Sequence, residues 1–79
     1  MNTYQLWLQP GECRQAVADA LLRLDKAEVS VAEVAREAFN LLDPDLAART
    51  QIGLALAHMG WRRVEYRTKQ PRYVWRRQP

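Results

Sequence analysis

The spacing of apolar residues changes at Gly60, and this change separates the 79-residue chain into two kinds of predicted structure. Before Gly60, apolar residues recur every three or four positions, as they do on one face of a helix. After Gly60, apolar and charged residues alternate, as they do along a strand. A chain of this length forms a single domain. The pattern therefore predicts a mainly α-helical domain that ends in a small β-hairpin.

The first helix is expected over residues 12–27, because the apolar side chains there form one stripe and the charged side chains lie outside it. Pro10 and Gly11 precede this stripe and are typical of a break in regular structure. Residues 1–11 are therefore expected to form an N-terminal arm, and residues 12–79 the folded domain. The apolar side chains of the arm are those of Tyr4, Leu6, Trp7 and Leu8.

The start of a second helix is marked by Ser30 and by Glu33 three residues later. This spacing is that of a capping box, in which each side chain accepts a hydrogen bond from the backbone of the other residue. Val29 before the cap and Val34 after it fit the hydrophobic staple that often accompanies the box. The sequence therefore predicts a second helix over residues 31–40.

Two helical pieces are expected after the second helix. Leu46 lies more than a quarter-turn away from the apolar face of the residues that follow it. The pattern therefore predicts a short helical turn at 44–48, then a break, and then a third helix that begins at Thr50 as its N-cap. This helix is expected to run to Met59 and to end at Gly60, which suits the left-handed position after a helix.

Two strands are expected after the third helix, over residues 61–67 and 72–77, with a loop between them at residues 68–71. A further short strand near Glu28 and Val29 is expected to pair with this hairpin. Three helices followed by a hairpin is the order of a winged helix-turn-helix, in which the hairpin is the wing. The predicted architecture is therefore a winged helix.

Charge is distributed unevenly along the chain, although the formal net charge is only +3. Residues 1–48 hold four basic and eight acidic residues, a net charge of −4. Residues 49–79 hold eight basic residues and one acid, a net charge of +7. Genome base composition explains a preference for arginine over lysine, but it does not explain this segregation. A basic half so concentrated predicts a polyanionic partner such as a nucleic acid.

Most of the positive charge falls in the expected hairpin, where seven cations and one anion occur within sixteen residues. Such like charges repel one another unless a polyanion lies against them, and arginine forks match phosphate oxygens. The alternative interpretation is a solvated basic hairpin whose aromatic residues cover the helices. Trp61 and at least one other aromatic residue of the hairpin are expected in the core. The cations expected to contact DNA are Arg62, Arg63, Arg67, Lys69, Arg72, Arg76 and Arg77.

The third helix offers polar side chains but little charge to a nucleic acid. Gln51 can bond bidentately to adenine in the major groove, and Thr50 can reach a phosphate or a base edge. Arg49 lies just before this helix, and His58 lies on the same side of it as Gln51. The alternative for Gln51 is plain surface polarity, and for His58 it is a surface or packing role. These four residues complete the expected DNA contacts.

The sequence offers no constellation for catalysis or metal binding. Cys13 is the one cysteine and His58 the one histidine, so neither an internal disulfide nor a Cys/His zinc site is expected. Cys13 is expected to be a small, buried or half-buried residue. No apolar run approaches the ~20 residues of a membrane span, and the start of the chain lacks the features of a signal peptide. We therefore expect a cytoplasmic protein that is not an enzyme and has no cofactor, metal or membrane association.

Four short segments carry a resemblance to a known family, namely VSVAEV at 29–34, RTQIGL at 49–54, MGWRR at 59–63 and VW at 74–75. Residues 30–77 resemble the small winged-helix domain at the C-terminus of phage and mobile-element primase-helicases of the virulence-associated protein E family. In that family, an Arg-Ile-Gly run and a Leu-Gly-Trp run precede a basic hairpin that ends in tryptophan. Those positions are occupied here by Ile52, Gly53, Met59, Gly60, Trp61 and Trp75.

The resemblance implies a nucleic-acid-binding winged helix that acts in phage or mobile-element replication or regulation. One departure concerns the outer face of the third helix, which tends to be basic in that family. The corresponding positions here are Thr50, Gln51, Leu54, Ala57 and His58. The basic surface has therefore moved from the helix to the hairpin.

The sequence thus predicts a winged-helix protein that binds double-stranded DNA, as a replication accessory or a small transcriptional regulator. The rival hypothesis is a protein-interaction module that blocks a host protein or self-associates, through the N-terminal arm or through Leu54 and Ala57. In that case the acidic first half and the basic second half would pair head to tail between subunits. Recognition of RNA or of Z-form duplex is a weaker alternative, which rests on Pro71 and Trp75.

Overall fold

A computed structural model describes residues 10–67, 69 and 72–78 of the chain. These residues form a mainly helical domain with three α-helices and a three-stranded antiparallel sheet, as the sequence predicted. Residues 1–9 of the expected arm, and residues 68, 70 and 71 of the expected loop, lie outside the described part. The elements in chain order are α2 (Pro10–Leu24), β1 (Glu28–Val29), α3 (Val31–Phe39), α4 (Leu46–His58), β2 (Arg62–Tyr66) and β3 (Arg72–Arg76).

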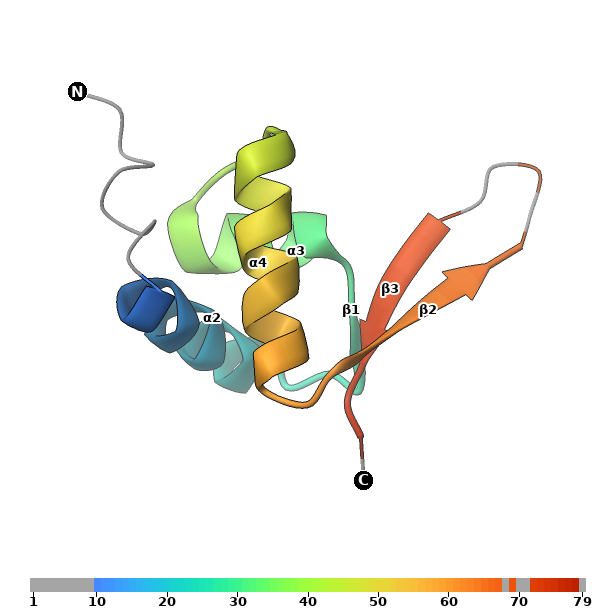
Figure 1. Cartoon of the computed structure of the whole chain (residues 1–79), viewed down its shortest axis with the longest axis horizontal. Coiled ribbons are helices and arrows are strands. Elements are labelled where there is room, and N and C mark those ends of the chain that lie inside the picture. Colours follow the sequence, from blue (N-terminus) through green and yellow to red (C-terminus); the bar gives the residue numbers. More distant parts are fainter. Residues whose placement is uncertain (1–9, 68, 70–71, 79) are drawn as a thin grey trace.

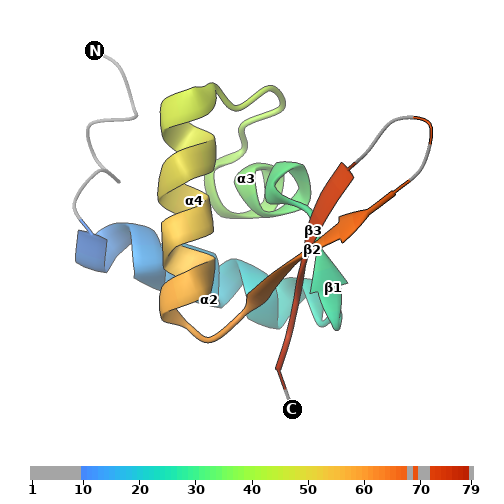
Figure 2. The same ribbon diagram turned by 45° about the vertical axis from the view of Figure 1, so that its right-hand side comes forward.

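The three helices pack together on one side of the molecule, and the hairpin of β2 and β3 projects away from them on the other side (Figure 1). The strand order is β1-β3-β2, so β1 brings the segment between α2 and α3 against the hairpin. A backbone hydrogen bond from Arg77 N to Ala27 O, at 2.8 Å, extends this pairing beyond the two residues of β1. A view turned by 45° shows that the far ends of β2 and β3 project beyond the helices (Figure 2).

Helix α2 starts and ends earlier than the sequence predicted. It begins at Pro10, so Pro10 and Gly11 belong to the helix and do not break the chain. Proline suits a first helical turn because its missing N–H would have no partner there. The helix ends at Leu24, and Asp25 takes a left-handed conformation with φ of 49°. Aspartate tolerates this conformation better than most residues do, which explains why the helix stops three residues before Ala27.

The capping box of α3 is confirmed. Ser30 Oγ accepts a hydrogen bond from Glu33 N at 3.1 Å, and Ser30 N donates to Glu33 Oε1 at 3.1 Å. Val29 and Val34, the residues of the predicted staple, are both buried in the core. Asn40 ends the helix in a left-handed conformation with φ of 55°. The predicted range of 31–40 therefore agrees with the structure to within one residue.

The break predicted before Thr50 is wrong, because Thr50 lies inside α4. The helix is continuous from Leu46 to His58, and its N-cap is Asp45, whose Oδ1 accepts from Ala48 N at 2.8 Å. Thr50 lies inside the helix, where its hydroxyl donates to the carbonyl of Leu46 at 2.8 Å. The prediction assumed that Leu46 must face the core. It is instead 79% exposed, so its position off the apolar face requires no break.

Gly60 ends α4 as predicted. Its φ of 88° is left-handed, which glycine adopts without the steric cost of a Cβ atom. Gly60 N donates to Ala57 O at 3.1 Å and Trp61 N donates to Leu56 O at 3.0 Å. These two bonds form a Schellman motif, which turns the chain from the helix into β2.

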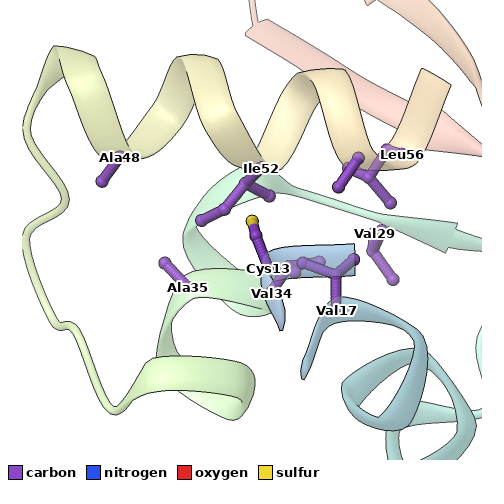
Figure 3. Packing of buried hydrophobic residues seen from close by; sticks show 9 residues of the cluster. Cys13, Val17, Val29, Val34, Ala35, Ala48, Ile52 and Leu56 are labelled. Atoms are coloured by element: carbon purple, nitrogen blue, oxygen red, sulfur yellow. The ribbon is translucent and has the colours of Figure 1, made fainter. Parts of the chain in front are cut away.

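The core is built from all three helices and from β1 (Figure 3). Val17 of α2, Val34 of α3 and Ile52 of α4 each have 0% of their surface exposed. Cys13 is buried among them, and its Sγ donates to the carbonyl of Gln51 at 3.9 Å. Burial raises the pKa of the Cys13 thiol above its ordinary value of 9.0. Cys13 is therefore a core residue, as predicted.

Candidate nucleic-acid interface

The register of the sheet assigns each hairpin side chain to one of two faces. Residues directly opposite each other in an antiparallel pair share a face, and successive residues alternate. Val29 and Trp75 are opposite each other and pack in or against the core, so their face is the inner one. The inner face carries Val29, Arg63, Glu65, Tyr73 and Trp75. The outer face carries Glu28, Arg62, Val64, Tyr66, Arg72, Val74 and Arg76.

Trp61 and Trp75 attach the hairpin to the helices. Both are half-buried and pack against the core, which confirms the prediction for Trp61 and one further aromatic residue. Trp75 lies close to Gly53 of α4, because a Cβ atom placed on Gly53 would be 3.5 Å from Trp75 Cζ2. The hairpin is thus fixed at its base, next to the middle of α4.

The single acid of the basic half, Glu65, lies on the inner face beyond Trp75. A hydrogen bond with Glu65 raises the pKa of the Tyr73 phenol. Glu65 Oε1 is also 3.5 Å from Arg67 Nε, but the Arg67 side chain is 91% exposed, and such a surface pair contributes little. The Arg63 guanidinium lies 4.9 Å from the centre of the Tyr73 ring. Arg63 and Arg67 therefore keep most of their charge accessible.

A polar network on the outer face joins all three strands. Glu28 Oε2 accepts hydrogen bonds from Tyr66 Oη at 2.7 Å and from Arg76 Nη2 at 2.7 Å. Arg76 Nη2 also donates to Tyr66 Oη at 3.0 Å. The bond from Tyr66, followed by that from Arg76, lowers the pKa of the Glu28 carboxyl. The charge of Arg76 is therefore largely compensated within the protein.

The other outer-face and terminal cations are less constrained. The Arg72 guanidinium lies 5.7 Å from the centre of the Tyr66 ring, so Tyr66 links Arg72 to the network at Glu28. Within the described residues, five exposed cations of the hairpin make no ion pair, namely Arg62, Arg63, Lys69, Arg72 and Arg77. The hairpin thus presents exposed positive charge, and of its two ion pairs in the described residues that of Arg76 is the closer.

The structure separates the four candidate residues of α4. At about 100° per residue, Arg49 lies about 40° around the helix from Gly53, which is next to Trp75. Gln51 and His58 lie about 140–160° from Gly53, on the flank of α4 away from the hairpin. Gln51 is half-buried, and the hydroxyl proton of Thr50 is used within the helix. Arg49 therefore lies on the flank of α4 that carries Gly53, whereas Gln51 and His58 lie on the other flank.

Sequence analysis missed the role of Glu28 and Tyr66. The sequence placed Tyr66 among the aromatic residues of the hairpin and Glu28 in a short strand, and it predicted no contact between them. Their contact joins residues 38 positions apart, and the contact of Glu28 with Arg76 joins residues 48 apart. The available signal was the expected strand at Glu28, because an acid on a strand beside a basic hairpin can face one of its arginines.

Comparisons with protein-family models, with curated proteins and with solved structures give no match to this chain. None of the described helices combines the length and the apolar character that crossing a bilayer requires. In residues 10–67, 69 and 72–78, no three His, Cys, Asp or Glu side chains gather where they could hold a metal ion. The charged surface of the hairpin is therefore the feature of this protein that bears on its function.

Proposed function

We propose that this domain is a winged helix-turn-helix module that binds double-stranded DNA, with the β2–β3 hairpin as its wing. The order helix, short strand, helix, helix, strand, strand supports this proposal, as does the sheet order β1-β3-β2. The resemblance to primase-helicase winged helices adds a setting, in phage or mobile-element replication or regulation. In this proposal, α3 and α4 form the helix-turn-helix.

The observation that carries the proposal is the exposed charge of the wing. Its cations are exposed, and the two nearby carboxylates, Glu28 and Glu65, contact Arg76 and Arg67. The remaining cations make no ion pair in the described structure, and a polyanion would relieve their mutual repulsion. Exposed arginines suit phosphate oxygens, because the guanidinium presents donors in a planar fork. Such contacts position a duplex but read little sequence.

Fluorescence anisotropy with a random duplex, titrated at several salt concentrations, tests this function. If about four to five phosphates are contacted, log K should fall against log salt with a slope of about −4. Replacing Arg67, Lys69 and Arg72 with Ala should weaken binding to every duplex and reduce the slope by up to ~3. Arg36→Ala is the matched control, because Arg36 is exposed on α3 in the acidic half. Absence of binding at low salt would reject the proposal.

A second candidate function, docking to a protein, is favoured by the outward surface of α4. Leu46 is 79% exposed and Leu54 is 60% exposed, and Ala57 is exposed beside them. Leu54 and Ala57 are three residues apart, so they lie on the same side of α4, and adjoining exposed apolar side chains are a feature of protein contacts. Sedimentation of the parent and of Leu54→Glu tests whether this surface joins two copies. A parent that stays monomeric at high concentration would exclude self-association.

A further inference from the structure

Three charged side chains form a row across the outer face of the sheet. Glu28 of β1 is opposite Arg76 of β3, and Arg76 is opposite Arg62 of β2. Arg76 is compensated by Glu28, whose Oε2 accepts from its Nε at 3.0 Å and its Nη2 at 2.7 Å. Arg62 makes no ion pair within the described residues, and it faces a second arginine across the strands. Like charges in directly opposite positions destabilise a sheet. The row holds two arginines and one carboxylate, so an anion beside Arg62 is missing from it.

The surface beside this row is hollowed. A depression of about 490 Å³ is lined by residues 62–65 of β2 and by residues 76–78. Arg62, Val64 and Arg76 line it from the outer face, and Arg63 and Glu65 line it from the inner face at the β2 edge of the sheet. Arg77 and Gln78 continue the lining past the end of β3. The hollow thus combines four guanidinium groups and an amide donor with one carboxylate, that of Glu65. The guanidinium and amide groups match the oxygens of a phosphate, which accept several donors at once.

We infer that this hollow binds a phosphodiester group of a nucleic-acid backbone, so that the duplex lies along the outer face of the sheet. This inference rests on the proposed function, and it names the surface that performs it. The phosphate takes the place of the missing anion beside Arg62. It is recognised by charge and donor geometry, without contact to a base.

The position of α4 supports the same surface. Trp75 lies between the outer face and α4, because it points inward onto Gly53. Gln51 and His58 are on the flank of α4 away from Gly53. The outward surface of α4 is meanwhile occupied by exposed leucines, which offer nothing to a phosphate. A duplex held at Arg62 is therefore not expected to use Gln51, which lies on the other flank of α4.

The test compares four proteins against a labelled random duplex at 0.1 M salt and at several higher concentrations. Arg62→Gln removes the uncompensated charge and should lower affinity about five- to tenfold, with the salt slope reduced by about 0.9. Arg36→Gln removes the same charge from α3 and should change neither quantity. Gln51→Ala should also leave binding unchanged. Thermal melts of each variant verify that the fold is retained.

Backbone amide shifts of labelled protein on addition of the same duplex provide an independent measurement. Shifts concentrated at residues 62–65 and 76–78 support the inference. Shifts confined to residues 49–58 overturn it, as does an Arg62→Gln variant that binds as tightly as Arg36→Gln does. Either of these results leaves the proposed function standing, since the parent still binds. A parent that does not bind duplex at low salt overturns both.

Discussion

Replacing Gly53 with alanine should stabilise the domain, although Gly53 is one of the residues on which the family resemblance rests. Gly53 lies in the interior of α4 and, unlike Gly60, is not at positive φ. Glycine in a helix interior is about 0.8–1 kcal/mol less favourable than alanine, chiefly because the unfolded chain loses more conformational freedom. The new methyl group would lie 3.5 Å from Trp75 Cζ2, which is an ordinary van der Waals contact. Among the described residues, no other atom lies within 4 Å of it outside the chain neighbours and the nearby backbone of α4.

The expected gain for Gly53→Ala is therefore about 1 kcal/mol in the free energy of unfolding, with a small further contribution from the contact with the indole. In a domain of this size, that gain corresponds to a rise in Tm of about 4–8 °C. Urea denaturation should show a higher midpoint with an unchanged m-value. The difference between Thr50→Ala and Thr50→Gly, measured at an exposed position one turn earlier, supplies the intrinsic alanine–glycine difference in the same helix.

Two further variants define what would refute this reasoning. Gly53→Leu should destabilise by about 1–3 kcal/mol, because its outer atoms would enter the space of the Trp75 ring. Gly60→Ala should destabilise by about 1–2 kcal/mol, because its φ of 88° is unfavourable for a residue with a Cβ atom. If Gly53→Ala lowers the Tm, then α4 and β3 pack more closely than this structure shows. If Gly60→Ala raises it, then the Schellman motif that ends α4 is not formed.

The remaining predictions concern capping and pH. Ser30→Ala should cost about 1 kcal/mol of stability by removing the N-cap of α3, without changing duplex affinity; an unchanged Tm would show that the box is absent in solution. Hydrogen bonds from Lys26 and Ser30 lower the pKa of the Glu33 carboxyl. Their contribution to the stability of the fold should therefore be complete above pH ~4.5 and be lost as pH falls through the lowered pKa, which thermal melts at several pH values would measure. The raised pKa of Cys13 makes stability change with pH in the opposite direction. Stability should decline as pH rises beyond ~9, and Cys13→Ala should flatten that decline. Native Cys13 should also resist alkylation until the chain unfolds; rapid labelling of the folded protein would contradict its burial.

The features predicted correctly from the sequence are those that neighbouring residues determine. Ser30 and Glu33 satisfy each other across three positions, and Gly60 supplies a conformation that few other residues adopt. The alternation after Gly60 specified both strands of the hairpin to within one residue at each end. In each case the information lies within about one turn of helix or a few residues of strand, so no knowledge of the tertiary fold was needed.

The errors came from features that depend on the tertiary fold. The break predicted before Thr50 assumed that a leucine avoids solvent, but exposed apolar side chains are common on folded proteins, and Leu46 is one of them. The grouping of Gln51 with the cations of the hairpin stays a prediction, but Gln51 lies on the flank of α4 away from Gly53. The grouping required knowledge of which flank of α4 the hairpin adjoins, and that flank is decided by the packing of Trp75 on Gly53.

The contacts of the acidic side chains bear on the head-to-tail hypothesis, in which the acidic half of one subunit covers the basic half of another. Three of the eight acids of residues 1–48 are paired with cations within the chain, Glu28 with Arg76, Glu33 with Lys26 and Glu37 with Arg23. Asp45 is engaged as the N-cap of α4, and Asp19 accepts from Gln15 within α2. The other three are Glu12, Asp25 and Asp43. They stand at the start of α2, just after its end and before α4, so they belong to three separate places along the chain. In the described residues, the acids of the first half that make no ion pair are thus spread over α2 and the segments after α2 and before α4, whereas the cations that make none are concentrated on the hairpin. This asymmetry favours an external polyanion over a second copy as the partner of the hairpin.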